Sequence, residues 1–211
     1  MHFISEDLEE YIEQHTSAES EVLKTLDRET NLKVMSPRML SGHVQGQALR
    51  MISMMIRPKN ILEIGTFTGY SAICFADGLL PGGKLTTIDI NAELEPMVRR
   101  YFKQAGIEDK INYLLGNALE IIPTLKDTFD LVFIDADKEN YSNYYDLVID
   151  KLPSGAFIIA DNVLWSGKVV LPKPDKDTKA LMEFNDKIQA DDSVENVLFP
   201  VRDGFMLIRK K

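Results

Sequence analysis

The chain has 211 residues, of which 45% are hydrophobic and 27% charged, a composition typical of a globular protein with one domain. Its net charge of −9, from 24 basic and 33 acidic residues, disfavours tight binding to nucleic acid, which needs a dense array of lysine and arginine. No apolar run approaches the roughly 20 residues of a membrane span. The acidic amino terminus does not resemble a signal peptide, and the single Cys74 excludes an intrachain disulfide, so we expect a cytoplasmic protein.

Residues 1–56 are expected to form a helical section that covers the cleft of a single domain, residues 1–211. Apolar residues recur at helical spacing in three segments, residues 6–14, 17–31 and 41–56. Pro37 falls between the second and third segments, so the chain around it is predicted to be a loop. The α/β core of the domain would then cover residues 57–211.

Within that core, apolar strand-like runs alternate with helical stretches. The predicted strands that a helix follows cover residues 60–64, 84–89, 111–115, 131–135 and 156–161. Such alternation indicates an α/β fold, in which helices cover both faces of a parallel sheet. Two more strands, 194–200 and 205–209, flank the turn sequence 201–204. We therefore expect seven strands, mostly parallel, with an antiparallel final hairpin.

The fourth and fifth strands run directly into side chains that carry oxygen or charge. Asp135 ends one strand and is followed by Asp137 and Lys138, and Asp161 ends the other and is followed by Asn162. Open α/β sheets bind ligands outside the carboxyl ends of their strands, where these groups would meet. Carboxylate and amide oxygens suit a hard cation such as Mg²⁺. The alternative is that each aspartate only ends a strand or caps the following helix.

The segment after the first strand, residues 63–71, favours a cofactor that lacks phosphates. Gly65 and Gly69 let the backbone pass close to a ligand, but the dinucleotide fingerprint fails because its third and sixth positions are not glycine. Glu63 would repel a phosphate and suits a cationic group. Asp89 ends the second strand, where an acidic residue can bind a ribose diol. S-adenosylmethionine has a ribose and a positive charge and no phosphate; the alternative is a turn without function.

These motifs resemble those of the class I, metal-dependent O-methyltransferases of the catechol and caffeoyl-CoA type. The similarity runs from about residue 34 to the carboxyl terminus, with its marks at residues 41–47, 63–71, 135–138, 161–165 and 203–204. The resemblance implies the Rossmann-like fold of S-adenosylmethionine methyltransferases and a homodimer. Amphipathic helices near the amino terminus have apolar faces to bury in such a dimer.

The resemblance also implies roles for individual residues. The ligands of a Mg²⁺ ion would be Asp135, Asp161 and Asn162, and Lys138 would be the catalytic base. The acceptor substrate would lie against Lys138 and Asn162. Trp165, which follows Asn162 closely in the sequence, is expected to form a wall of the acceptor site; the alternative is a role in the core or in a dimer contact. Contacts to S-adenosylmethionine would come from Met39, Ser41, Glu63, Gly65, Thr66, Ser71, Asp89, Ala118 and Asp135.

The predicted reaction is methyl transfer to one hydroxyl of a vicinal diphenol, a small phenolic substrate. A hard cation that binds both hydroxyls lowers the pKa of the bound oxygen, and a neutral Lys138 would accept the proton. The chain departs from its relatives at Ala136 and Asp137, where animal catechol methyltransferases carry an aromatic gate. Residues 166–175 offer two lysines, Lys168 and Lys173, but no tyrosine, which weakens a caffeoyl-CoA ester as substrate.

Two other classes of function stay open. Methylation of a hydroxylated tRNA uridine would keep the chemistry and change the substrate, although the net charge of −9 disfavours it. The other class is a binding module that uses the fold without turnover. The intact set of Asp135, Lys138, Asp161 and Asn162 argues against such a module. His43 is expected to be structural, and Asn185 is given no role.

Overall fold

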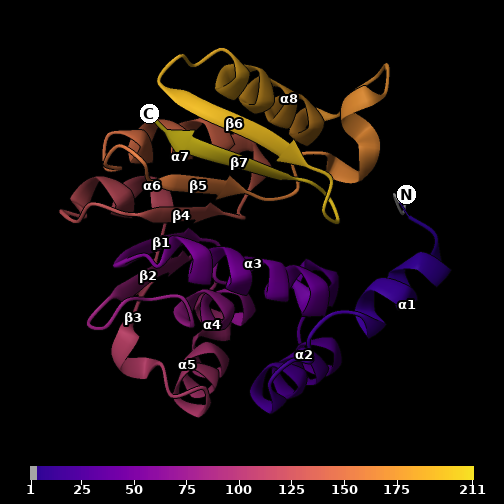
Figure 1. Cartoon of the computed structure of the whole chain (residues 1–211), viewed down its shortest axis with the longest axis vertical. Coiled ribbons are helices and arrows are strands. Elements are labelled where there is room, and N and C mark those ends of the chain that lie inside the picture. Colours follow the sequence, from indigo (N-terminus) through magenta and orange to yellow (C-terminus); the bar gives the residue numbers. More distant parts are fainter. Residues whose placement is uncertain (1–3) are drawn as a thin grey trace.

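The computed structural model describes residues 4–211 and places them around a seven-stranded sheet (Figure 1). The strands are β1 (Asn60–Ile64), β2 (Lys84–Asp89), β3 (Ile111–Leu115), β4 (Leu131–Ile134), β5 (Phe157–Ala160), β6 (Val194–Phe199) and β7 (Phe205–Lys210). The α-helices are α1 (Glu6–Gln14), α2 (Glu21–Lys33), α3 (Gly42–Ile56), α4 (Tyr70–Ala76), α5 (Glu95–Gln104), α6 (Ala118–Ile121), α7 (Tyr141–Ile149) and α8 (Lys176–Gln189). Single turns of 3₁₀ helix are η1 (Pro37–Met39), η2 (Ala92–Leu94), η3 (Glu108–Lys110), η4 (Ile122–Thr124), η5 (Lys138–Asn140) and the longer η6 (Trp165–Val170).

The strand order is β3-β2-β1-β4-β5-β7-β6. Strands β1 to β5 pair in parallel, whereas β7 runs antiparallel to both β5 and β6. The predicted sheet with its antiparallel final hairpin is confirmed. Asp135 and Asp161 were predicted inside strands but lie one residue beyond β4 and β5, at the carboxyl edge. The direction of strand succession reverses between β1 and β4, which is where sheets of this type bind ligands.

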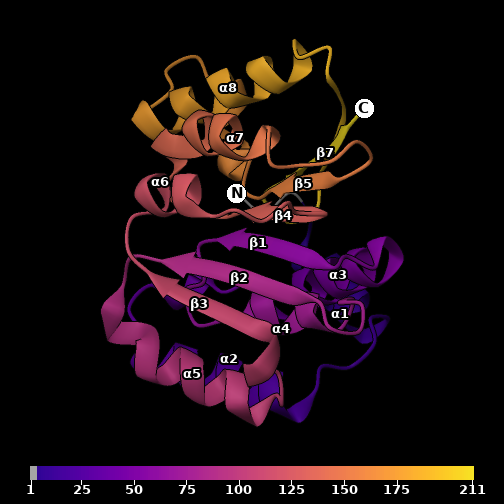
Figure 2. The ribbon, with the colours of Figure 1, turned by 90° about the vertical axis from the view of Figure 1, so that its left-hand side faces the viewer.

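Helices cover both faces of the sheet, as Figure 2 shows. On one face, Leu131 and Phe133 of β4 belong to a buried cluster with residues of α3, α4 and α5, and α2 packs outside that layer. On the other face, Val132 and Ile134 belong to a second cluster with residues of α7 and α8. Because β4 is covered on both sides, all four of its residues are apolar and fully buried.

The three expected helices near the amino terminus are present, with one displaced start. Helix α2 begins at Glu21 and not near Ser17, because the Ser20 hydroxyl caps it by accepting the Leu23 N–H at 3.3 Å. The Ser17 carbonyl instead accepts a hydrogen bond from His43 at 2.7 Å. His43 is thus bound to backbone, in the structural role that was expected for it.

The amino-terminal helices pack on the core through α3. Leu49 of α3 is fully buried in the same cluster as Ile61 of β1. The division into a cap of residues 1–56 and a core of residues 57–211 stays a prediction. None of the helices in residues 4–211 is long and apolar enough to cross a membrane.

Candidate active site

The candidate site lies at the carboxyl edge of the sheet, where β1 and β4 end. Gly65 follows β1 with a φ of 101°, and a Cβ at this position would lie 1.9 Å from the backbone oxygen of Asp135. Only glycine fits there, since both the backbone conformation and the contact exclude a side chain. This close approach brings the loop after β1 against the first residue after β4. The two predicted motifs, one for a cofactor and one for a cation, therefore lie side by side at this edge of the sheet.

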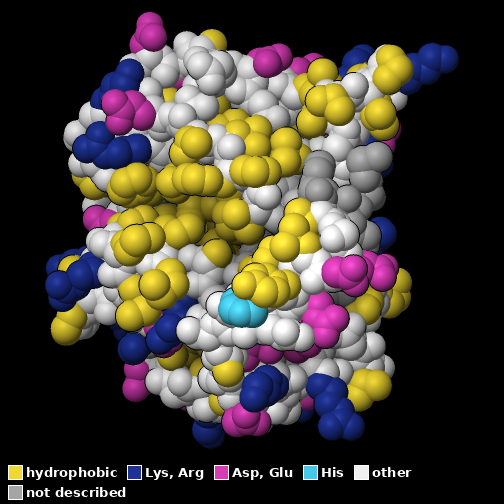
Figure 3. Space-filling model, turned by 45° about the vertical axis from the view of Figure 1, so that its right-hand side comes forward, with side chains coloured by type: hydrophobic (Ala, Val, Ile, Leu, Met, Phe, Trp, Pro, Cys, Tyr) yellow, Lys and Arg dark blue, Asp and Glu magenta, His cyan; other side chains and the backbone are white. Residues whose placement is uncertain are grey.

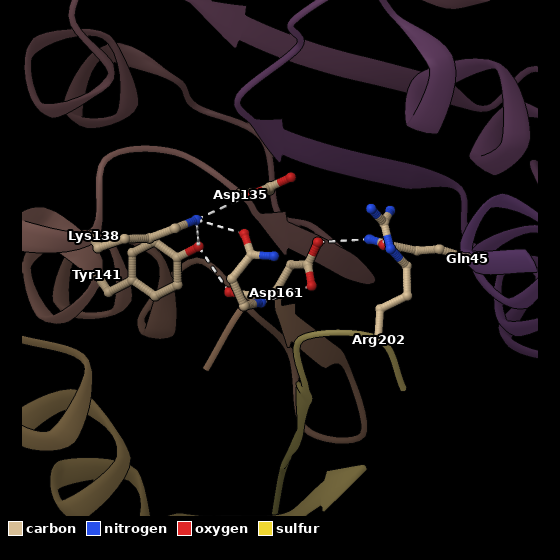
Figure 4. Close-up of polar contacts among 7 residues, drawn as sticks. Gln45, Asp135, Lys138, Tyr141, Asp161 and Arg202 are labelled. Atoms are coloured by element: carbon tan, nitrogen blue, oxygen red, sulfur yellow. Dashed lines mark hydrogen bonds and ion pairs between the residues drawn. The ribbon is translucent and has the colours of Figure 1, made fainter. Parts of the chain in front are cut away.

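The lysine of the second motif points into a cluster of oxygen atoms (Figure 4). Lys138 Nζ donates hydrogen bonds to Asp135 Oδ1 at 3.0 Å, to Asn162 Oδ1 at 2.8 Å and to the Tyr141 hydroxyl at 2.6 Å. Its side chain is only 9% exposed. Tyr141 in turn donates its proton to the Asp161 carbonyl at 2.9 Å. The structure therefore brings together all four residues that were predicted for the metal and for catalysis.

Asp161 is the most deeply buried of these residues, with 2% of its surface exposed. Burial and then the negative charge of Asp135 raise the pKa of the Asp161 carboxyl to about 7. Each of its oxygens accepts one hydrogen bond of 2.6 Å, from the Asn162 N–H and from the Gln45 amide. Asn162 has a left-handed backbone with a φ of 60°, which turns the chain sharply after β5.

These donors fit a hard divalent cation. Asp135 and Asn162 already direct oxygen atoms at one cationic group, the Lys138 ammonium, and Asp161 adds a second carboxylate beside them. A divalent ion stabilises the buried Asp161 carboxylate and the Asp135 carboxylate beside it, whose side chain is 22% exposed. In residues 4–211, no three His, Cys, Asp or Glu side chains are grouped to hold a metal. A site here would therefore depend on the Asn162 amide as a ligand.

The cofactor motif contains a second buried carboxylate. Glu63 is completely buried and accepts hydrogen bonds from the hydroxyls of Ser71, at 2.6 Å, and Thr87. The Thr66 and Thr87 hydroxyls also share a hydrogen bond. Burial raises the pKa of Glu63 to about 8, and these hydrogen bonds moderate the rise. The carboxyl is therefore mostly protonated at neutral pH until a cationic group approaches.

The remaining predicted cofactor residues differ in burial and come from different elements. Asp89 ends β2, and its carboxylate accepts the Phe67 N–H of the glycine loop at 2.7 Å and the Asn91 N–H at 2.8 Å. Ala118 begins α6 and is buried. Ser41, just before α3, is buried, whereas Met39 in η1 is 59% exposed.

Trp165 lies beside Lys138, and its expected role as a wall of the acceptor site stays a prediction. Its ring centroid is 5.6 Å from Lys138 Nζ and 5.7 Å from Lys168 Nζ. Its indole N–H is buried without a hydrogen-bond partner in the described part of the chain. The backbone of Trp165 is left-handed, with a φ of 46°. Asn185 of α8, which was given no role, donates to the Val163 carbonyl at 3.0 Å and so holds the segment before this ring.

Three residues of the site were not found by sequence reasoning. Gln45 contacts Asp161, Tyr141 contacts Lys138, and Arg202 contacts Gln45 at 2.7 Å. Tyr141 could have been found from its spacing, because it follows Lys138 by three residues and so lies on the same side of a helical turn. Gln45 and Arg202 gave no local signal, since they reach the site from an amino-terminal helix and a carboxyl-terminal turn.

Comparison with known proteins places this site in a family. A sequence model described as O-methyltransferase matches residues 13–211. The chain belongs to the O-methyltransferase family. Caffeoyl-CoA O-methyltransferase 1 of Eucalyptus globulus is 37% identical over 205 residues, which cover 91% of this chain and 82% of the plant protein. Caffeoyl-CoA O-methyltransferase 1 of Arabidopsis thaliana is 35% identical over 98% of this chain and 85% of that protein.

Solved structures agree with this assignment. An O-methyltransferase from Bacillus cereus in complex with SAH has a TM-score of 0.90 and 26% identity, with 97% of each chain covered. The O-methyltransferase TomG from Streptomyces achromogenes, in complex with SAM, has a TM-score of 0.88 and 27% identity over 97% of this chain and 96% of its own. The protein is thus an S-adenosylmethionine-dependent O-methyltransferase related to the caffeoyl-CoA enzymes, as the sequence motifs predicted.

Proposed function

We propose that this O-methyltransferase transfers the methyl group of S-adenosylmethionine to one hydroxyl of a vicinal diphenol, with Mg²⁺ as cofactor. The observation that carries the proposal is the convergence of Asp135, Asp161 and Asn162 around the buried Lys138 ammonium. An oxygen-rich, partly buried cluster with a lysine suits an acceptor that must lose a proton before it attacks a methyl group.

The chain's own residues would position the methyl donor. The glycine loop passes the edge of β1 without side-chain obstruction at Gly65, and Asp89 stands at the end of β2 to accept from ribose hydroxyls. Glu63 would offer its carboxylate to a cationic part of the donor. Bound S-adenosylmethionine supplies an electrophilic methyl group on a positively charged sulfur. Catalysis would then rest mainly on alignment of donor and acceptor.

The acceptor hydroxyls would meet the cation cluster and the lysine. Asp135, Asp161 and Asn162 would hold Mg²⁺, which stabilises negative charge on a phenolic oxygen when it is bound. Lys138 in its neutral amine form would accept the proton of the reacting hydroxyl and become an ammonium. The Tyr141 hydroxyl, 2.6 Å from Nζ, would keep the lysine aimed at the cluster. Trp165 would border the aromatic ring of the acceptor beside both lysine ammonium groups.

A caffeoyl-CoA ester is a second candidate acceptor, which the names of the plant relatives favour. The lysines of residues 166–175 would have to bind its phosphates. Lys168 is partly neutralised by an ion pair with Asp175 at 2.9 Å, which weakens that role. A tRNA acceptor is disfavoured by the net charge of −9.

A methyl-transfer screen would distinguish these acceptors. Purified protein, S-adenosylmethionine and Mg²⁺ would be incubated with catechols, with hydroxycinnamoyl-CoA esters or with hypomodified tRNA, and methylated product measured by mass spectrometry. We expect turnover of catechols. Turnover of the CoA esters alone would select the second candidate, and methylation of tRNA alone would contradict both.

We also propose that the enzyme is a cytoplasmic homodimer. Helices α7 and α8 cover one face of the β5-β7-β6 region, but the opposite face, which includes Leu207, borders a groove of about 680 Å³ lined also by Met55 of α3. Exposed Val197 of β6 pairs in register with Leu207. Figure 3 shows a broad apolar area with a hollow on the molecule. An exposed apolar area of this kind is typical of a subunit interface.

Light scattering at micromolar concentration should give twice the mass of the chain. The variant Val197→Glu should be a monomer, and Leu32→Glu, at a position 71% exposed on α2, should leave the mass unchanged. A wild-type mass of one chain across this range would contradict the homodimer.

A further inference from the structure

Arg202 and Gln45 form a hydrogen-bonded connection between the final hairpin and the buried Asp161. Arg202 lies in the turn between β6 and β7, with a left-handed φ of 47°. Its Nη1 atom donates to the Leu40 carbonyl at 3.1 Å, to the Ser41 carbonyl and to Gln45 Oε1 at 2.7 Å. Figure 4 shows the two side chains meeting on the side of Asp161 away from Lys138.

The chemistry of arginine fixes which way the Gln45 amide faces. A guanidinium can only donate, so the Gln45 carbonyl oxygen must face Arg202. The Gln45 NH₂ group must then face Asp161, where it donates to Oδ2 at 2.6 Å. Gln45 is 1% exposed, so water does not compete for either end of this amide. The Asp161 carboxylate favours the same orientation because it can only accept, so removing Arg202 would leave the buried Gln45 oxygen without its charged donor and hold the amide less firmly.

This connection limits the orientations that the Asp161 carboxylate can take. The Asn162 N–H binds one oxygen and Gln45 binds the other, so the carboxylate cannot rotate freely about its last bond. Each oxygen keeps a free lone pair, which can face a cation. Groups that hold a metal ligand in place usually contribute strongly to metal affinity, although they never touch the metal.

We propose that Gln45 is a positioning residue that orients Asp161 for cation binding, and that Arg202 sets the orientation of Gln45. This inference rests on the proposed cation site. It also links that site to the cofactor segment, because the same Arg202 nitrogen binds the carbonyl of Ser41. Ser41 and Gln45 come from the start of α3, Asp161 directly follows β5, and Arg202 lies in the turn between β6 and β7. They converge only in the folded chain.

The test is Mn²⁺ binding without any acceptor, measured by electron paramagnetic resonance of free Mn²⁺. Gln45→Leu removes both hydrogen bonds at nearly constant volume, and we expect its Kd for Mn²⁺ to rise by about 10- to 100-fold. The matched control is Gln47→Leu, on the same helix. The Gln47 amide donates to the carbonyls of Ser17 and Ala18 and has no contact with Asp161 or Arg202 among the described hydrogen bonds. Gln47→Leu should keep the wild-type Kd.

Arg202 provides a second, independent variant. Arg202→Met should weaken Mn²⁺ binding in the same direction, and Arg202→Lys should recover most of the affinity because a single nitrogen makes all three contacts. A role limited to folding would lower thermal stability in these variants and leave the Kd of the folded protein unchanged, which would overturn the inference. If wild-type protein binds Mn²⁺ and Gln45→Leu binds it equally well, the positioning role alone is refuted. If wild-type protein binds no Mn²⁺, the proposed cation site fails and the positioning role fails with it.

Discussion

Replacing Glu63 by glutamine should stabilise the protein without its cofactor, and increasingly so as pH rises. Burial raises the pKa of this carboxyl to about 8 from an ordinary value of 4.5. The folded protein therefore holds a proton through a pH range in which the unfolded chain has lost it. Stability from this group is complete below about pH 4.5 and is lost as pH rises through 8. Glutamine carries no titrating proton, so the loss should be absent in the variant.

The size of the effect follows from the pKa difference. Each pH unit between the two pKa values costs about 1.4 kcal/mol. From pH 5 to pH 7.5 the free energy of unfolding of the wild type should therefore fall by about 3 kcal/mol relative to Glu63→Gln. The amide fits the existing network, because the Thr87 hydroxyl can accept its N–H while donating to Thr66. Other titrating groups, such as Asp161, are present in both proteins and cancel in the difference.

Urea denaturation at pH 5, 6, 7 and 7.5 would measure this difference directly. Curves of unfolding free energy against pH that run parallel for the two proteins would refute the reasoning. The pH dependence of S-adenosylmethionine binding tests the Glu63 pKa a second time, because a cation beside Glu63 favours its ionised form. Calorimetric affinity of the wild type should rise with pH toward 8, by up to about tenfold per unit. Glu63→Gln should bind more weakly, with less dependence on pH.

Two further substitutions address the lysine and the glycine loop. Lys138→Met should lower kcat by about 10²- to 10⁴-fold, the usual contribution of a general base. Lys138→Arg should lower kcat nearly as much, because guanidinium cannot accept a proton. A near-normal kcat for Lys138→Met in steady-state kinetics would exclude Lys138 as the base. Gly65→Ala should destabilise the fold by about 3 kcal/mol, because its methyl group would meet the Asp135 backbone oxygen at 1.9 Å. An unchanged denaturation midpoint would contradict the close approach of Gly65 to Asp135.

Much of the fold could be predicted because its signals are local. The strands β1, β2 and β3 begin and end where alternation and apolar runs placed them, and β4 reads as four apolar residues because helices cover both its faces. The start of α2 was misplaced because Ser17 and Ser20 are equally good caps by residue type. Only the backbone path, which brings the Ser17 carbonyl to His43, decides between them.

The candidate site was predictable only where its residues follow strand ends. Asp135, Lys138 and Asp161 lie beside the ends of neighbouring parallel strands, so topology alone brings them together. Gln45 and Arg202 approach the same carboxylate from segments 157 residues apart, and no local pattern marks either one. Their roles depend on tertiary contacts, which a single sequence does not display.

The most direct test of the account is the metal dependence of methyl transfer to catechol. Protein stripped with EDTA would be assayed with S-adenosylmethionine, first without metal and then with increasing Mg²⁺, and Asp161→Ala would be assayed in parallel. We predict no turnover in EDTA, full recovery with Mg²⁺, and no recovery in Asp161→Ala although it still binds S-adenosylmethionine. Full activity of the wild type in excess EDTA would contradict the metal-assisted mechanism.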